Sequence, residues 1–166
     1  MKNIFIDTNI LLDVIRYREG FYEDASKVWA DCESHKVRGF ISAISLNNVY
    51  YIVRKLVPQD TALTYIRLML NVFSIVPLDE TILRLSVDFP HKDFEDAIQT
   101  FSAVQVKAEC IVTRDRSHFS NNYMPVVSPH PSTVECQGPF WRCHNRPGTG
   151  RRLEPAAVPP AQVFPG

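Results

Sequence analysis

Aspartates occupy three positions of this chain where a short apolar run stops or a helical pattern starts. Asp7 directly follows the β-prone run 4–6, Asp96 lies within DFEDAIQ, and Asp115 closes the stretch CIVTRD. An acid at the end of a buried strand is rarely a packing residue, because burying an unpaired carboxylate costs free energy. These three side chains are therefore candidates for catalysis or metal binding.

A fourth acid, Asp93, precedes Asp96 by three residues, a spacing that puts both carboxylates on one face of a helix, one turn apart. The buried face of this helix is marked by Ala97, Ile98, Phe101 and Val104, so Asp96 is expected at its border. Helix capping is the alternative, since Asp93 as N-cap and Glu95 in the first turn both suit the positive end of the helix dipole. Capping accounts for Asp93 better than for Asp96.

The chemistry expected of these acids is the binding of a hard divalent cation. CIVTRD repeats the pattern of the opening, so two parallel, adjacent strands would bring Asp7 and Asp115 to one sheet edge, with Asp96 close by. Such carboxylates repel one another unless a cation is present. Oxygen ligands of this kind prefer Mg²⁺ or Mn²⁺. A turn or capping role is the common alternative for any single aspartate, but recurrence at like positions favours the metal.

The elements that must position these acids alternate between strands and helices. Strands are predicted near 3–6, 38–42, 72–76, 109–113 and 124–128. Helices are predicted at 9–17, 23–36, 45–56 and 93–107, with two more N-capped by Asp60 and Asp79. This alternation predicts an α/β fold, a three-layer α/β/α sandwich with a central, mainly parallel sheet of about five strands. Active sites of such sheets lie at the carboxyl ends of the strands.

Composition limits the classes of function. The 166 residues are 45% hydrophobic and carry 18 basic and 18 acidic side chains, enough for one core and too balanced for binding nucleic acid through net charge. Nucleic acid would have to be recognised locally, for example through a metal. No signal-peptide core and no run of about 18 apolar residues is present, so we expect a cytoplasmic protein without a membrane partner.

The C-terminal part differs in composition. Nine of the twelve prolines and four of the six glycines lie between Pro125 and the end of the chain, a density that no helix or strand tolerates. We therefore expect a globular domain over 1–128 and a disordered tail over 129–166. The tail holds Cys136, Cys143 and His144, which match no common zinc spacing. Cys32 and Cys110 have the pattern of reduced core thiols.

Four stretches, IDTNILLD, ISAISLNNVYYIVRK, DFEDAIQTFSA and IVTRD, occur in an order and at separations that resemble a PIN domain. The chain is most similar to the PIN ribonucleases that act as VapC-type toxins of toxin–antitoxin pairs, and the resemblance spans about residues 1–129. It implies an endoribonuclease that cleaves RNA with Mg²⁺ or Mn²⁺. It also implies a homodimer and an antitoxin partner that covers the acidic site.

The resemblance assigns roles to individual residues. Asp7, Asp96 and Asp115 match family acids that hold the metal, and Asp93 is an additional acid. Thr8, Asn9 and Thr113 complete the motifs at the strand ends. One departure is Asn48, which stands where the family usually has a second acid. Because an amide brings no charge, we expect weaker metal binding.

Several neighbouring residues have both a functional and a structural interpretation. Ser42 and Ser45 would orient water or phosphate, with capping by Ser45 as the alternative. Three basic residues would neutralise RNA phosphates, with surface salt bridges as the alternative; these residues are Lys92, Arg114 and Arg116. His91 and His118 are candidates for a general base, although a metal-bound hydroxide needs none.

Two other functions compete with the nuclease. With Asn48 in place of an acid, the chain would be a catalytically weak module that binds RNA or protein. A phosphatase of the haloacid dehalogenase type also has an aspartate after its first strand. That chemistry needs a second aspartate two positions later, where this chain has Asn9.

Overall fold

A computed structural model describes residues 1–89, 93–119 and 123–129 of the chain. His91, Lys92 and the predicted tail beyond Pro129 lie outside the described residues. Within the part that is described, no helix is both long and apolar enough to cross a bilayer.

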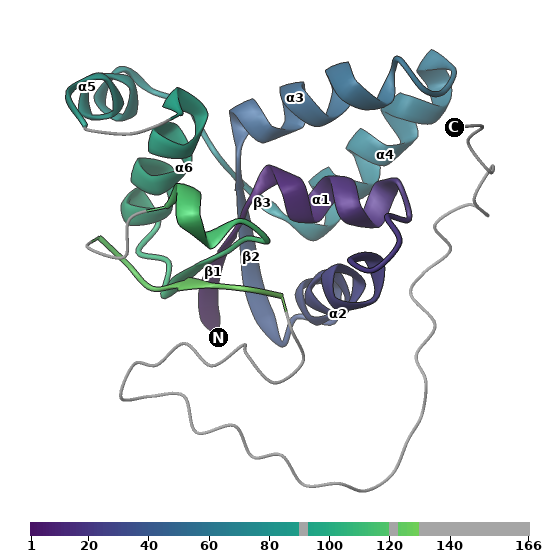
Figure 1. Cartoon of the computed structure of the whole chain (residues 1–166), viewed down its shortest axis with the longest axis horizontal. Helices are drawn as coiled ribbons and strands as arrows, with labels where there is room; N and C mark the ends of the chain where they lie inside the picture. Colours follow the sequence, from purple (N-terminus) through teal and green to yellow (C-terminus); the bar gives the residue numbers. More distant parts are fainter. Residues whose placement is uncertain (90–92, 120–122, 130–166) are drawn as a thin grey trace, which may run out of the picture.

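Five parallel strands form a single sheet (Figure 1) in the order β3-β2-β1-β4-β5. Their bounds are Lys2–Ile6 (β1), Val37–Ser42 (β2), Ser74–Val76 (β3), Cys110–Val112 (β4) and Val126–Val127 (β5). The strands run parallel because a helical crossover follows each of the first three, and helices cover both faces. The predicted fold class is therefore confirmed.

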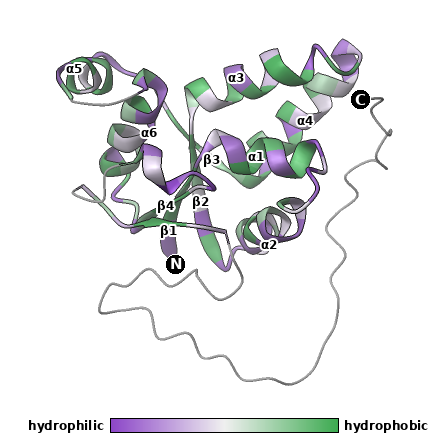
Figure 2. Ribbon diagram, in the orientation of Figure 1, coloured by the Kyte–Doolittle hydropathy of each residue, from purple (hydrophilic) through white to green (hydrophobic). Residues whose placement is uncertain are grey.

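Six α-helices cover the sheet in the described residues: Thr8–Ile15 (α1), Tyr22–Glu33 (α2), Ala43–Val53 (α3), Gln59–Val72 (α4), Glu80–Asp88 (α5) and Phe94–Gln105 (α6). Figure 1 shows α5 and α6 on one side of the sheet and the other four helices on the opposite side. The alternation of β1 explains the two cores: Ile4 and Ile6 pack toward α1 to α4, and Phe5 packs toward α5 and α6. Figure 2 shows the strands as mainly hydrophobic.

The predicted boundaries of β3 and α4 were wrong. The strand expected over 72–76 begins later, at Ser74, because α4 continues to Val72. Phe73, which is extended, joins the helix to the strand. The same helix begins at Gln59, with Pro58 rather than Asp60 at the N-cap position. Proline has no backbone N–H but keeps its carbonyl. The Pro58 carbonyl accepts the first helical hydrogen bond, from the Ala62 N–H at 3.1 Å. Asp60 instead lies in the first turn, where its charge suits the helix dipole.

Helix α3 begins earlier than predicted, at Ala43, and the capping role expected of Ser45 was wrong. Ser42 is the N-cap, and its hydroxyl accepts from the backbone N–H of Ile44 at 3.4 Å. Ser45 is therefore inside the helix and fully buried. Its hydroxyl is 2.9 Å from that of Thr8, which joins α3 to the start of α1.

A close contact between α2 and the sheet depends on Gly39 of β2. A Cβ atom at this position would lie 2.6 Å from Cys32 Sγ and 2.8 Å from Phe73 Cδ1, distances that close packing does not allow. Glycine lets the Cys32 side chain of α2 lie directly on the strand. The thiol is consequently buried, and burial raises its pKa to about 12.

The predicted reduced state of the core cysteines leads to a test with a thiol reagent. The Cys32 and Cys110 side chains are buried, and since the thiolate is the reactive species, we expect neither to react at pH 8 in the folded protein. A variant with Cys136→Ser and Cys143→Ser removes the remaining thiols. In this variant, Ellman's reagent should report no rapid reaction until urea unfolds the chain; rapid labelling of the folded protein would contradict the buried position of Cys32.

Candidate metal centre

The candidate site lies where the connections of the sheet change direction. The chain passes from β1 outward to β2 and β3, then crosses back so that β4 pairs with the other side of β1. Ligand sites of parallel sheets form at the carboxyl ends of strands beside such a switch. The Asp7 N–H donates to the Val112 carbonyl at 3.0 Å, so the two strand ends that carry Asp7 and Asp115 are adjacent, as predicted.

Asp7 is 4% exposed, and its carboxylate is held by the end of β4. Thr113 Oγ1 donates to Asp7 Oδ2 at 2.6 Å and accepts from Asn9 Nδ2 and from the Asp115 N–H, each at 3.0 Å. Because the Thr113 hydroxyl has one proton, these two donors direct it toward Asp7. Burial raises the pKa of Asp7, and the hydrogen bond from Thr113 opposes that rise. Asn9 and Thr113 therefore fix the position of Asp7.

Asp96 lies at the start of α6, facing His118. Its Oδ2 is 3.5 Å from His118 Nδ1, and His118 Nε2 is 3.2 Å from Asp115 Oδ2. Burial, followed by the negative charges of Asp7 and Asp93, raises the pKa of Asp96 to about 7. Asp96 Oδ2 is buried and receives no hydrogen bond from the described residues. His118 thus lies between two of the predicted acids.

The two remaining predicted acids are more exposed. Asp93 is the N-cap of α6 and accepts from the Glu95 N–H at 2.7 Å, so the capping interpretation holds for this residue. Asp115 accepts a hydrogen bond from Ser117 Oγ at 2.7 Å, and this bond lowers its pKa. Both side chains also line the pocket that contains Asp7 and Asp96.

Glu95 has a role that its position in the first turn of α6 did not predict. Its Oε1 is 2.9 Å from Thr8 Oγ1 and 3.4 Å from Gln99 Nε2. Gln99 is four residues further along α6 and only 1% exposed, so Glu95 and Gln99 share one face of the helix. The sequence signal for this pair would have been Gln99, a polar residue on the buried face of α6, one turn after the acid Glu95.

Arg114 is oriented by a second residue that sequence reasoning missed, Asp13. Arg114 Nη1 donates to Asp13 Oδ1 at 2.7 Å, and the guanidinium carbon lies 4.7 Å from the centre of the Phe21 ring. Asp13 is 1% exposed, and burial raises its pKa against the opposing charges of Arg114 and Arg18. An acid on the apolar face of α1 was the available signal. The guanidinium is therefore held at the pocket wall rather than free in solvent.

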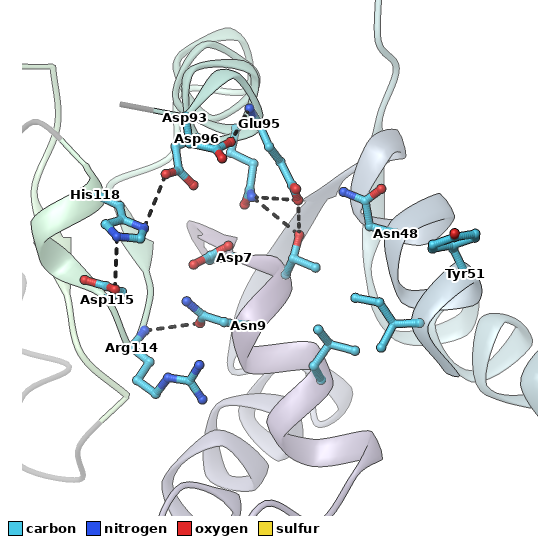
Figure 3. Close-up of a pocket in the computed structure, with 14 residues that line it drawn as sticks. Asp7, Asn9, Asn48, Tyr51, Asp93, Glu95, Asp96, Arg114, Asp115 and His118 are labelled. Atoms are coloured by element: carbon cyan, nitrogen blue, oxygen red, sulfur yellow. Dashed lines mark hydrogen bonds and ion pairs between the residues drawn. The ribbon is translucent and has the colours of Figure 1, made fainter. Parts of the chain in front are cut away.

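These side chains line one pocket of about 590 Å³. Figure 3 shows acids from α6 above Asp7, His118 and Asp115 on one side, and Asn48 and Tyr51 of α3 on the other. Of the predicted residues, the pocket brings together Asp7, Thr8, Asn9, Asn48, Asp93, Asp96, Arg114, Asp115 and His118. Ser42, Thr113 and Arg116 are not among the lining residues, and Lys92 lies outside the described part of the chain. The other lining residues are Leu12, Tyr51, Ile52, Glu95 and Gln99.

The oxygen atoms of this pocket suit a hard cation, although its carboxylates do not converge on a single point. Among the described residues, no group of three His, Cys, Asp or Glu side chains is arranged to hold a metal ion as it stands. The carboxylates nevertheless offer only oxygen, the donor that Mg²⁺ and Mn²⁺ prefer. Asp96 Oδ2 has no hydrogen-bond partner among the described residues, and the charge of Asp7 opposes its ionisation. A cation would relieve both conditions.

Comparison with known families gives a match over most of the chain. The family model described as "PIN domain" matches residues 3–117. Among curated proteins, Ribonuclease VapC1 from Aquifex aeolicus is 23% identical over 124 residues, which are 72% of this chain and 85% of the relative.

Two solved structures with the same fold are described as a toxin–antitoxin complex and as a toxin. A toxin–antitoxin complex from Klebsiella pneumoniae has a TM-score of 0.59 and 25% identity, and the match covers 76% of this chain and 98% of that one. VapC20 of Mycobacterium tuberculosis, described as a toxin that cleaves the sarcin–ricin loop, has a TM-score of 0.53 and 13% identity, with 72% and 92% covered. At that identity, VapC20 shows the shared fold alone.

Proposed function

Because the chain belongs to the PIN domain family, we propose that it is a metal-dependent endoribonuclease that hydrolyses RNA phosphodiester bonds. The proposal rests on one observation. Asp7, Asp96 and Asp115 come from three separate elements and line one pocket at the switch point of the sheet. Its similarity to a curated VapC ribonuclease supports the same activity.

In this mechanism Asp7, Asp96 and Asp115 hold Mg²⁺ or Mn²⁺, with Asp93 as a further acid. When bound, such an ion lowers the pKa of water and offsets negative charge on the scissile phosphate. Thr113 keeps the Asp7 carboxylate directed into the pocket. The Thr113 hydroxyl is itself oriented by Asn9 and by the backbone N–H of Asp115. His118 lies between Asp96 and Asp115 and contacts both carboxylates.

The substrate phosphate has a candidate partner in Arg114. A guanidinium has five N–H donors, and the hydrogen bond from Arg114 to Asp13 uses one of them. Arg114 lines the pocket, so its other N–H groups would donate to phosphate oxygens of RNA, an anion that Arg binds well. Arg116 and Lys92 stay proposed contacts to neighbouring phosphates.

We propose that the chain acts as the toxin of a toxin–antitoxin pair, with residues 1–128 as the nuclease domain. Support comes from the solved relatives, several of which are complexes of toxin and antitoxin. The proposed partners are an RNA substrate, an antitoxin protein and a second copy of the chain. The neutral Asn48 on the α3 wall favours a second candidate, a catalytically weak module that binds RNA or protein.

A cleavage assay separates the two candidates. The purified full chain is incubated with a panel of transfer and ribosomal RNAs in Mn²⁺, in Mg²⁺ or in EDTA. We expect defined cleavage products only with metal, and a loss of roughly 10³-fold in rate when metal is removed, since the ion supplies several kcal/mol of transition-state stabilisation. RNA binding without cleavage in any metal would support the binding module, and equal cleavage in EDTA would refute the metal mechanism.

A further inference from the structure

The α3 wall of the pocket carries no charged side chain. Its lining residues are Asn48, Tyr51 and Ile52, whereas all carboxylates of the pocket come from the ends of β1 and β4 and from α6. A cation held only by those carboxylates would have anionic ligands on one side and a neutral amide on the other. A charge on the α3 side would balance the site.

Glu95 reaches toward that wall from α6. Figure 3 shows its side chain extending from α6 to the side of the pocket where Asn48 lies. Glu95 Oε1 is 2.9 Å from Thr8 Oγ1, which is itself 2.9 Å from Ser45 Oγ. Ser45 is one turn before Asn48 on α3, so the two share a face of the helix. The Glu95 carboxylate is thus linked through one hydroxyl to the helix that carries Asn48.

We propose that Glu95 is a fourth anionic ligand of the metal centre and supplies, from α6, the charge that Asn48 does not supply from α3. The inference rests on the proposed metal-dependent function and adds a residue to it. Consecutive residues of a helix point about 100° apart, so Glu95 and Asp96 diverge. Asp96 faces His118, and Glu95 faces Thr8, which lets one helix terminus contribute acids to both sides of the pocket.

Helix capping does not explain this position of Glu95. Asp93 already caps α6 through the Glu95 N–H, and a first-turn acid that serves only the dipole has no need to leave solvent. Glu80 of α5 shows the contrast. It is also an acid in the first turn, directly after the N-cap Asp79, but it is 75% exposed and pairs only with Arg84 among the described residues. Glu95 is half-buried and hydrogen-bonded inside the pocket.

Gln99 provides an independent indication that a ligand belongs beside Glu95. The side chain is 1% exposed and lines the pocket, and its Nε2 lies 3.4 Å from both Thr8 Oγ1 and Glu95 Oε1. Its Oε1 is buried and has no hydrogen-bond partner among the described residues. A buried amide oxygen without a donor is costly. A cation, or a water bound to one, would satisfy it.

The test is Mn²⁺ binding to the RNA-free protein, measured by calorimetry. Glu95→Gln keeps the size of the side chain and an oxygen that accepts from Thr8, but it removes the charge. We expect Mn²⁺ affinity to fall by at least roughly 10- to 100-fold, the range for residues that support metal ligands from the outer shell and one that a direct ligand should reach. Glu80→Gln, the matched first-turn acid of α5, should bind Mn²⁺ as the unmodified chain does. Melting temperatures confirm that each variant is folded.

A second variant tests the placement of the charge. Adding Asn48→Glu to Glu95→Gln restores an anion from the opposite wall, and we expect Mn²⁺ affinity to recover. Failure to recover would overturn the placement of Glu95 beside Asn48. If Glu95→Gln binds Mn²⁺ normally while Asp7→Asn does not, the inference fails and the proposed function stands. If neither variant changes Mn²⁺ binding, the proposed function fails as well.

Discussion

The Asp7→Asn variant is expected to cleave RNA at least about 10³-fold more slowly than the unmodified chain at saturating Mn²⁺, because losing the ion's stabilisation costs several kcal/mol at the transition state. Asparagine has nearly the shape of aspartate and still accepts the hydrogen bond that Thr113 Oγ1 donates. The substitution therefore removes the charge and little else. Asp7 is the acid with the largest expected effect, since it is buried where β1 meets β4.

The measurement is single-turnover cleavage of one RNA from the panel, with the melting temperature as a check on folding. Asp60→Asn is the matched control, because Asp60 is an exposed aspartate in the first turn of α4, away from the pocket. It should cleave at the unmodified rate. A folded Asp7→Asn protein that cleaves normally would show that the pocket is not where the reaction occurs.

The architecture and the positions of the acids could be predicted because both depend on local signals. Two apolar runs, Ile4–Ile6 and Cys110–Val112, end at acids in the same way, and the alternation of strands with helices requires parallel strands. The sequence left the adjacency of β1 and β4 as a condition, and the sheet order meets it, because the two strands pair directly. The metal-binding roles of Asp7, Asp96 and Asp115 stay predictions until an ion is measured.

The polar partners of the site could not be predicted, because each joins residues far apart in the chain. Thr8 and Glu95 are separated by 87 positions, and Asp13 and Arg114 by 101. No spacing rule relates such pairs; the direction of a side chain depends on which face of its helix meets which neighbour. Glu95 was therefore assigned to the helix dipole alone, although Gln99 one turn later offered a second local signal. The early start of α3 has a similar cause, since Ser42 and Ser45 are both acceptable caps by sequence.

The raised pKa of Asp96 predicts that the site costs stability when no metal is bound. The pKa of Asp96 is about 7 in the folded protein, whereas an ordinary aspartate carboxyl has a pKa of 3.8. Between these values the folded state binds more protons than the unfolded state, so the free energy of unfolding falls as pH rises from 4 to 7. The penalty is absent below about pH 4 and complete above about pH 7. Burial beside Asp7 and Asp93 is its cause.

The Asp96→Asn variant, which cannot ionise at this position, should escape that penalty. In EDTA at pH 8 we expect it to be more stable than the unmodified chain by roughly 1–2 kcal/mol, a value reduced from the full shift because solvent screens a partly exposed group. Urea unfolding in EDTA at pH 4.5 and at pH 8 measures the difference, which should grow with pH. Saturating Mn²⁺ should narrow or reverse it, because the ion stabilises the unmodified fold more than the variant. A pH-independent difference would mean that burying an ionised Asp96 beside Asp7 and Asp93 costs no stability, and the electrostatic argument for a cation at this pocket would lose its support.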